Sequence, residues 1–204
     1  MLPNNNNLVK RKIAQYHPRN GLSPVSKFYL ALLAVRHEQV KEHSERVALL
    51  AEAVAAKLKT DKKAAFFGGL FHDVGKLLLP AELFDGREIS EEEYTRIKEH
   101  AIAGFKALKG IHFFTAMCAG LHHALYKKGY GLSTKEFPDN WHPSTIKKVL
   151  EISTIISVCD FIDAANHRKT KFKSGPIADI RQALLEKYPG DERIIDIALK
   201  VNRW

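Results

Sequence analysis

The chain has 204 residues, of which 45% are hydrophobic and 27% are charged, so it is long enough for one domain with a sizeable core. The formal net charge of +9 can steer anionic ligands, either nucleic acid or a phosphorylated small molecule, or it can serve only solubility. Two cysteines, Cys118 and Cys159, lie in apolar stretches and argue against a disulfide scaffold and for a reducing compartment. No apolar run reaches the roughly 18 residues of a membrane helix, and the first residues do not form a signal peptide. We therefore expect a cytoplasmic protein with no membrane partner.

The first half of the chain predicts three helices after a polar start. Residues 1–23 are polar and turn-rich, and one helical domain is expected over residues 24–204. A first helix starts near Ser23. The next helix places His43 among apolar residues at steps of three and four, with an opposite charged face formed by Lys41, Glu42, Glu45, Arg46 and Glu52. Thr60 or Asp61 caps a third helix that ends near Gly75.

The second half predicts further helices and one long loop, so the fold class is all-α. Ser90 and Glu93 form a capping box that begins a helix running to Gly110. A helix from about Phe113 delivers the pair His122-His123 at its end, and Pro143 begins the helix that contains Asp160. Residues 126–143 have the length of a candidate lid. Two short helices are expected around 176–187 and 190–202.

Seven residues of metal-ligand type are spread over these helices. Asp160 stands inside an apolar run that must be buried, where a carboxylate requires a cation, several donors or protonation. His43 lies in an apolar stripe, where an unpaired polar group costs roughly 1–3 kcal/mol. A shared site explains both better than separate structural roles, and imidazole with carboxylate suits iron, manganese or zinc. The set is large enough for two ions: His43, His72, Asp73, His100, His122, His123 and Asp160.

The motifs around these residues resemble those of the HD phosphohydrolase superfamily. The resemblance rests on His43-x-x-Arg46, the stretch His72-Asp73-Val-Gly-Lys76, His100-x-x-x-Gly104, His122-His123 and Asp160-x-x-Asp163, and it covers roughly residues 35–170. The order and context of the motifs are most similar to the HD-GYP branch of bacterial cyclic di-GMP phosphodiesterases. This resemblance implies an HD-domain helical bundle with a buried dinuclear metal site.

The resemblance also implies roles for individual residues. The seven residues would hold two divalent transition-metal ions, with iron or manganese favoured over zinc or nickel, and Asp73 would bridge them. Lys76 would contact the phosphate, although a surface lysine at a helix C-terminus is the simpler alternative. Asp163 either orients a ligand histidine from outside or pairs with Arg168. Tyr130 either stacks on a base or anchors the loop.

Other positions bear on metal number and on substrate. Gln39 stands where some family members carry the glutamate that binds a third metal, so two ions are expected. Arg168 is the arginine retained from a family segment after Asp163, and with Lys76 and Tyr130 it completes the expected substrate contacts. The family proline after Tyr130 is replaced by Gly131, and Ala124 replaces the usual glutamate after the histidine pair. A looser loop is expected there, and with it weaker activity on cyclic di-GMP.

The predicted function is metal-dependent hydrolysis of a phosphoester, in a nucleotide or a cyclic dinucleotide, by an activated hydroxide. The expected partner is an anionic phosphorylated small molecule, and no specific nucleic-acid partner is expected because no nucleic-acid module or basic-aromatic alternation is present. Oligomerisation is left open. Two alternatives are a catalytically idle nucleotide- or metal-binding signalling module and an HD-fold di-iron oxygenase.

Overall fold

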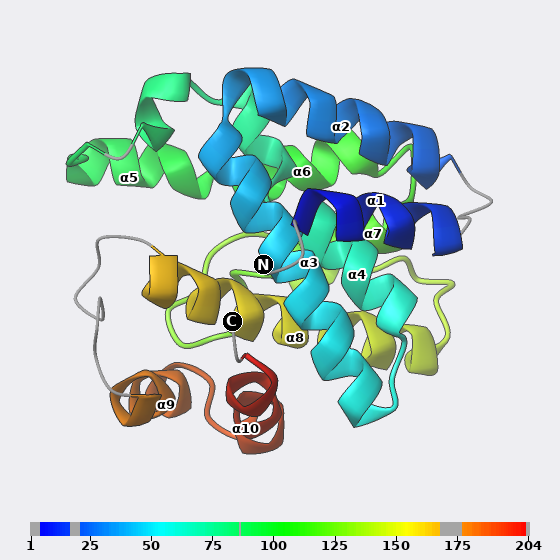
Figure 1. The fold of residues 1–204 in the computed structure, drawn as a ribbon. Helices are drawn as coiled ribbons and strands as arrows, with labels where there is room; N and C mark the ends of the chain where they lie inside the picture. The colour runs from blue at the N-terminus through cyan, green and yellow to red at the C-terminus, as the bar shows by residue number, and fades with distance from the viewer. Residues whose placement is uncertain (1–4, 17–20, 86, 168–176, 203–204) are drawn as a thin grey trace.

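The computed structural model describes residues 5–16, 21–85, 87–167 and 177–202, and its regular structure there is helical, as the sequence predicted. No helix among these residues combines the length and apolarity that crossing a membrane requires. The α-helices, drawn in Figure 1, are α1 (Asn5–Tyr16), α2 (Leu22–Arg36), α3 (Glu38–Leu58), α4 (Lys62–Phe71), α5 (Glu91–Lys98), α6 (His100–Leu108), α7 (Phe113–Leu121), α8 (Pro143–His167), α9 (Ile177–Lys187) and α10 (Glu192–Val201). Short 3₁₀ helices η1 (Val74–Leu78), η2 (Ala81–Phe84) and η3 (Thr134–Glu136) lie in the connections.

Helix α3 runs through the middle of the molecule and packs against α4, α8, α10, α1 and α2 (Figure 1). The long helix α8 packs in turn against α7 and α4. Val47, Phe71, Met117 and Ile156, from these four helices, are completely buried. The core therefore surrounds the stretches of α3, α4, α7 and α8 that also carry the ligand-type residues.

Several helix boundaries follow from the capping residues that the sequence indicated. Asp61 caps α4 by accepting a hydrogen bond from the backbone N–H of Ala64 at 3.0 Å. Ser90 and Glu93 form the expected capping box at the start of α5. Helix α8 starts at Pro143, where proline's fixed φ suits a first turn. These local signals set where the site-bearing helices begin.

The N-terminal segment differs from its prediction, because residues 5–16 form helix α1 and bury Val9 and Ile13. This helix covers the side of α3 that was predicted to face solvent. Glu52 accepts a hydrogen bond from Lys12 of α1 at 2.6 Å and is only 7% exposed. The sequence analysis also placed Lys41, Glu42, Glu45 and Arg46 on that outer face. Of these, Lys41 and Glu45 are buried.

The helix predicted from Ser90 to Gly110 is broken at Glu99 into α5 and α6. The break makes His100 the first residue of α6 and turns it toward η1. Gly75 of η1 allows this approach, because a Cβ on Gly75 would lie 2.0 Å from the carbonyl oxygen of His100. A glycine at this position therefore brings Asp73 and His100 together.

Candidate metal centre

Five separate parts of the fold deliver the seven ligand-type residues to one buried place. Three overlapping groups form there, each with its ligand atoms within 4.8 Å of one another. The groups are His43, His72 and Asp160; His72, Asp73 and His122; and His100, His122 and His123. His123 is the most open member, with a side chain 15% exposed. The structure thus brings together all seven residues that the sequence singled out.

The backbone fixes which nitrogen of each histidine faces the centre. The Nδ1 atoms of His72, His100 and His122 lie 2.7, 2.6 and 2.7 Å from the carbonyl oxygens three residues earlier in the chain. A carbonyl oxygen can only accept, so each Nδ1 carries the proton and donates it. The lone pair of each Nε2 is consequently left to face the centre.

The Nε2 atoms then meet one another in pairs. The distance is 3.3 Å between His43 and His72, and 3.3 Å between His100 and His122. On a neutral ring whose proton is on Nδ1, Nε2 presents only a lone pair, so a cation between the two nitrogens of each pair would stabilise this arrangement. Neutral imidazole nitrogens beside carboxylates are a donor set that suits divalent transition metals.

Two aspartates extend across the histidine cluster. Asp73 places Oδ1 at 3.3 Å from Nε2 of His100 and Oδ2 at 3.3 Å from Nε2 of His72. Asp160 places Oδ1 at 3.0 Å from Nε2 of His43 and Oδ2 at 3.9 Å from Nε2 of His123. Each carboxylate therefore lies between the group of His43, His72 and Asp160 and the group of His100, His122 and His123, with one oxygen toward each.

Burial and neighbouring charges set the protonation of the cluster. Burial lowers the pKa of His100 to about 4 and that of His123 to about 3, so both rings are neutral near pH 7. Burial alone would raise the pKa of Asp73, but His72 and Lys76 hold it well below its usual value. The pKa of Asp160 is likewise lowered, against its burial, by His43. Burial alone would lower the pKa of His72, but Asp73 and Asp160 raise it. Metal binding would displace a proton from this ring, because neutral imidazoles and charged carboxylates are the forms that bind metal.

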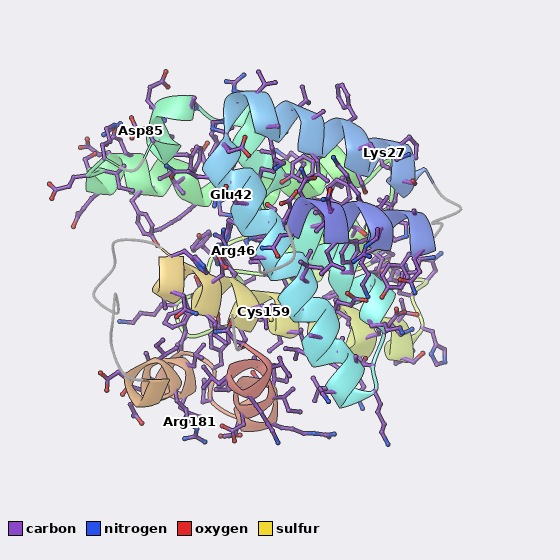
Figure 2. All side chains as sticks on the ribbon, in the orientation of Figure 1. Lys27, Glu42, Arg46, Asp85, Cys159 and Arg181 are labelled. Atoms are coloured by element: carbon purple, nitrogen blue, oxygen red, sulfur yellow. The ribbon has the colours of Figure 1, made fainter. Side chains whose placement is uncertain are left out.

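Asp163 holds His43 from outside the cluster. Its carboxylate accepts hydrogen bonds from Nδ1 of His43 at 2.7 Å and from Nε and Nη2 of Arg46 at 2.7 and 3.0 Å. Burial alone would raise the pKa of Asp163, but hydrogen bonds from His167, His43 and Arg46 lower it. Arg46 was placed on the outer face of α3, but it lies where α3 meets α8 (Figure 2). Its spacing of three residues from His43 is the sequence signal that could have located it.

The expected substrate contacts have different surroundings. Lys76 is buried in η1, and its ammonium contacts Oδ2 of Asp73. Tyr130 covers His123, with ring centres 4.6 Å apart and planes inclined by 35°. Arg168 lies outside the described residues. Lys76 is thus buried, and it is not the surface lysine at a helix C-terminus that the sequence also allowed.

The two histidines His122 and His123 lie in the turn that directly follows α7. α7 stops at Leu121, and the ring centres of His122 and His123 lie 4.0 Å apart. Sequence reasoning missed the residues around this turn. Tyr126 lies 3.3 Å from Nδ1 of His123 through its hydroxyl, and Tyr188 reaches the turn from α9. Tyr126 follows His123 by three residues, whereas no sequence signal connects Tyr188 with the site.

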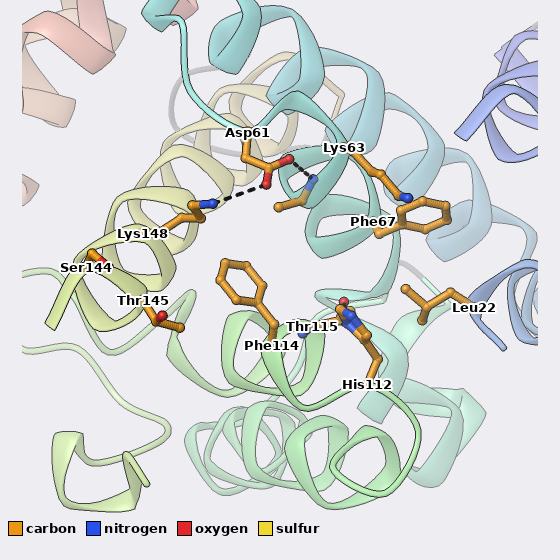
Figure 3. A pocket seen from close by; sticks show the side chains of 11 residues that line it. Leu22, Asp61, Lys63, Phe67, His112, Phe114, Thr115, Ser144, Thr145 and Lys148 are labelled. Carbon is orange, nitrogen blue, oxygen red and sulfur yellow. Dashed lines mark hydrogen bonds and ion pairs between the residues drawn. The ribbon is translucent and has the colours of Figure 1, made fainter. Parts of the chain in front are cut away.

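A pocket of about 680 Å³ lies between the beginnings of α4, α7 and α8 (Figure 3). Phe67 and Phe114 form apolar walls, and Asp61 pairs with Lys148 at its edge. The seven ligand-type residues are absent from its lining. The α4 and α7 histidines stand at the opposite ends of those helices, so this pocket is separate from the metal centre.

Residues 40–165 match the HD domain family, and this stretch includes all seven ligand-type residues. The chain belongs to the HD domain family. The His72-Asp73 pair lies within this matched stretch, together with the other ligand-type residues.

Two curated relatives share part of the sequence with this HD domain. The 3'3'-cGAMP-specific phosphodiesterase 1 of Vibrio cholerae serotype O1 is 34% identical over 88 residues, which cover 40% of this chain and 20% of the relative. Ribonuclease Y of Chlorobaculum tepidum is 32% identical over 93 residues, which cover 45% of this chain and 15% of the relative. The chain therefore spans a fifth or less of these relatives.

Crystal structures with the same fold include the HD domain of the L. monocytogenes phosphodiesterase PgpH. That structure has a TM-score of 0.58 and 20% identity, and the match covers 84% of this chain and 95% of that one. The same domain in complex with cyclic-di-AMP has a TM-score of 0.58 and 19% identity, with 84% and 94% covered. These structural matches support the HD fold over a larger part of the chain than the residues 40–165 that match the family.

Proposed function

We propose that this HD domain is a metal-dependent phosphohydrolase that cleaves a phosphodiester bond in a nucleotide, with a cyclic dinucleotide as the leading substrate. The position of Asp73 carries the proposal. Its two carboxylate oxygens lie 3.3 Å from Nε2 of His100 and 3.3 Å from Nε2 of His72, which belong to different groups of ligand-type residues. A carboxylate in this position can bridge two cations.

The donor set supports two divalent ions, with iron or manganese favoured. His43, His72 and Asp160 would hold one ion, and His100, His122 and His123 the other, with Asp73 shared. Gln39 offers an amide where a third ion would need a stronger ligand. When bound, two such ions would supply an acidified water and would stabilise the charge on the phosphate oxygens.

The chain's own groups orient and neutralise the reactants. Asp163 and Arg46 keep Nδ1 of His43 engaged, so that Nε2 stays aimed at the centre. The ammonium of Lys76, held against Asp73, would add positive charge next to the phosphate. The free face of the Tyr130 ring would stack on a base, and Arg168 would contact a phosphate from outside the described residues.

The substrate class is inferred from the relatives together with the site. One relative is named a 3'3'-cGAMP-specific phosphodiesterase, and the PgpH domain was crystallised with cyclic-di-AMP. A net charge of +9 suits such anionic ligands. We also propose a cytoplasmic location, because Cys118 and Cys159 are free and buried.

An anaerobic hydrolysis screen tests the proposal. Phosphomonoesters, an aryl phosphodiester and cyclic dinucleotides would be incubated with the protein and Mn²⁺ or Fe²⁺, and hydrolysis of phosphodiesters is expected. Turnover that requires O₂ would favour the di-iron oxygenase, and binding of nucleotide without any turnover would favour the idle signalling module.

Within the screen, cyclic di-GMP is expected to be a poor substrate relative to the aryl phosphodiester. The altered segment, with Gly131 for proline and Ala124 for glutamate, lies beside Tyr130 and the histidine pair. The measurement is kcat/KM for both compounds under one metal condition. A cyclic di-GMP value about a thousandfold higher, or about 4 kcal/mol of extra transition-state stabilisation, would contradict this expectation.

A further inference from the structure

The end of α9 reaches the metal centre from outside the residues that match the HD domain family. The family match ends at residue 165, whereas α9 ends at Lys187, with Tyr188 directly after it. Helices α9 and α10 lie together beside α8 (Figure 1). Lys187 and Tyr188, named here the α9 clasp, contact the turn that carries His122 and His123.

Tyr188 reaches the backbone of His122 through one buried serine. The Tyr188 hydroxyl lies 2.8 Å from Oγ of Ser157, and the Ser157 hydroxyl donates to the carbonyl oxygen of His122. Since Ser157 donates its one hydrogen to His122, its Oγ can only accept from Tyr188, and the Tyr188 hydroxyl also donates to the backbone carbonyl oxygen of Ser157, at 3.1 Å. Tyr188 and Ser157 are each 1% exposed and His122 is fully buried, so water cannot replace either bond.

Lys187 holds the same turn from its other side. Its Nζ lies 3.8 Å from the ring centre of Tyr126, and its carbonyl oxygen accepts a hydrogen bond from the backbone N–H of Lys127 at 3.2 Å. The Tyr126 hydroxyl lies 3.3 Å from Nδ1 of His123. In the described part of the chain Lys187 has no carboxylate at ion-pair distance, and its ammonium lies over the aromatic rings of Tyr126 and Phe161.

Both contacts of the clasp end on one half of the cluster. His122 and His123 share a group with His100, and His122 also joins His72 and Asp73, whereas His43, His72 and Asp160 are carried by α3, the end of α4 and α8. We infer that Lys187 and Tyr188 are positioning residues that set the metal affinity of the His100, His122 and His123 position. The inference rests on the proposed function, because it presumes that this cluster binds metal.

Titration of the metal-free protein with Mn²⁺ by calorimetry tests the inference. Two reference variants, His43→Ala and His123→Ala, assign each binding step to one half of the cluster. In Tyr188→Phe and Lys187→Met, the step lost in His123→Ala is expected to weaken by about tenfold or more, as for other outer-shell partners of metal ligands. The step lost in His43→Ala should change much less, since the contacts of the clasp end on the turn of His122 and His123, and only a charge interaction between Lys187 and Asp160 reaches the other half.

Matched variants separate positioning from general damage to α9. Lys187→Arg keeps a cation over Tyr126 and should restore the affinity. Arg181→Ala removes an exposed ion pair between α9 and Asp196 of α10, at 2.8 Å, and should leave both steps unchanged. If Tyr188→Phe fails to fold by circular dichroism, the Lys187 pair of variants decides the matter alone.

Equal weakening of both steps, or no change in either, would overturn the positioning role. The proposed function fails in a different way, because then the parent protein itself takes up no Mn²⁺. A parent that binds two ions, beside clasp variants that bind them equally well, contradicts the inference alone.

Discussion

At the scale of single residues, the site depends on where each histidine keeps its proton. Backbone carbonyls hold the Nδ1 protons of His72, His100 and His122, and Asp163 holds that of His43. Four nitrogens are thereby aimed inward as acceptors. The charged oxygens of Asp73 and Asp160 lie beside these nitrogens, and together they form a donor set that suits cations.

Replacing Asp73 with alanine is expected to abolish hydrolysis while leaving the helical fold intact. The Asp73 carboxylate lies 3.3 Å from Nε2 of both His72 and His100, whereas Asp160 reaches His123 only at 3.9 Å. A fall of at least about a thousandfold in kcat/KM, or about 4 kcal/mol, is expected in a steady-state phosphodiester assay. Asp85→Ala, at an exposed carboxylate, is the matched control. Activity within about tenfold of the parent, with metal retained, would show that Asp73 is not the bridge.

The depressed histidine pKa values predict an acid-sensitive metal-free protein. Unfolded histidines take up protons near pH 6.5, whereas burial lowers the pKa of His100 to about 4 and that of His123 to about 3. The unfolded state binds more protons in this window, so the free energy of unfolding should fall as the pH drops from about 6.5 to about 4. Urea unfolding across this range measures the slope.

A variant of His123 separates its contribution to the pH dependence from that of His72. The pKa of His72 is shifted upward, so His72 opposes the loss of stability at low pH. His123→Asn should make the slope shallower, because one proton-excluding ring is removed. An unchanged slope in this variant would show that His123 does not resist protonation in the folded protein.

At the scale of elements, the stretch after the histidine pair is fixed more firmly than a missing proline suggests. Tyr130 donates its backbone N–H to the carbonyl oxygen of His123 at 2.8 Å, and Leu132 donates to that of Gly120 at 2.8 Å. Gly131 between them has φ of 119°. The looseness expected from the sequence therefore does not extend to residues 130–132.

Adding a side chain at Gly131 should destabilise this element. A Cβ there would lie 2.5 Å from the carbonyl oxygen of Gly120, and the positive φ already disfavours alanine. Gly131→Ala is expected to lower stability by about 1–3 kcal/mol, and Gly131→Pro should cost more because proline fixes φ near −65°.

The thermal unfolding temperature of Gly131→Ala would be compared with that of Gly110→Ala. At Gly110 an added Cβ meets no atom within 4 Å. Gly110→Ala should unfold close to the parent temperature. A gain in stability or activity from the Gly131→Pro change, which restores the family sequence, would refute the observed backbone at this position.

The sequence predicted elements wherever a local signal was strong. Asp61, the Ser90 and Glu93 pair, and Pro143 mark helix starts in a way that depends only on their neighbours. The break at Glu99 has no such signal, since neither glycine nor proline occurs there and tertiary packing decides it. Helix α1 was missed because, within the described residues 5–16, just two residues, Val9 and Ile13, are buried, and the segment begins with a run of asparagines.

At the scale of the whole molecule, residue types revealed the ligand set but not what holds it. Seven histidines and aspartates could be grouped because their chemistry is shared, whatever their distance in the chain. Lys187 and Tyr188 could not be found in this way, because lysine and tyrosine occur on many surfaces. Their role depends on how α9 packs, which only the three-dimensional structure describes.

The activity of the metal-free protein during stepwise return of Mn²⁺ tests the central claim most directly. Protein stripped with a chelator would be titrated anaerobically while hydrolysis of an aryl phosphodiester and bound metal are both followed. Because the seven ligand-type residues form overlapping groups and Asp73 lies between His72 and His100, activity should stay negligible without metal and reach its plateau at about two ions per chain. Hydrolysis that proceeds fully without metal, or a reconstituted protein that binds none, would contradict a dinuclear phosphohydrolase.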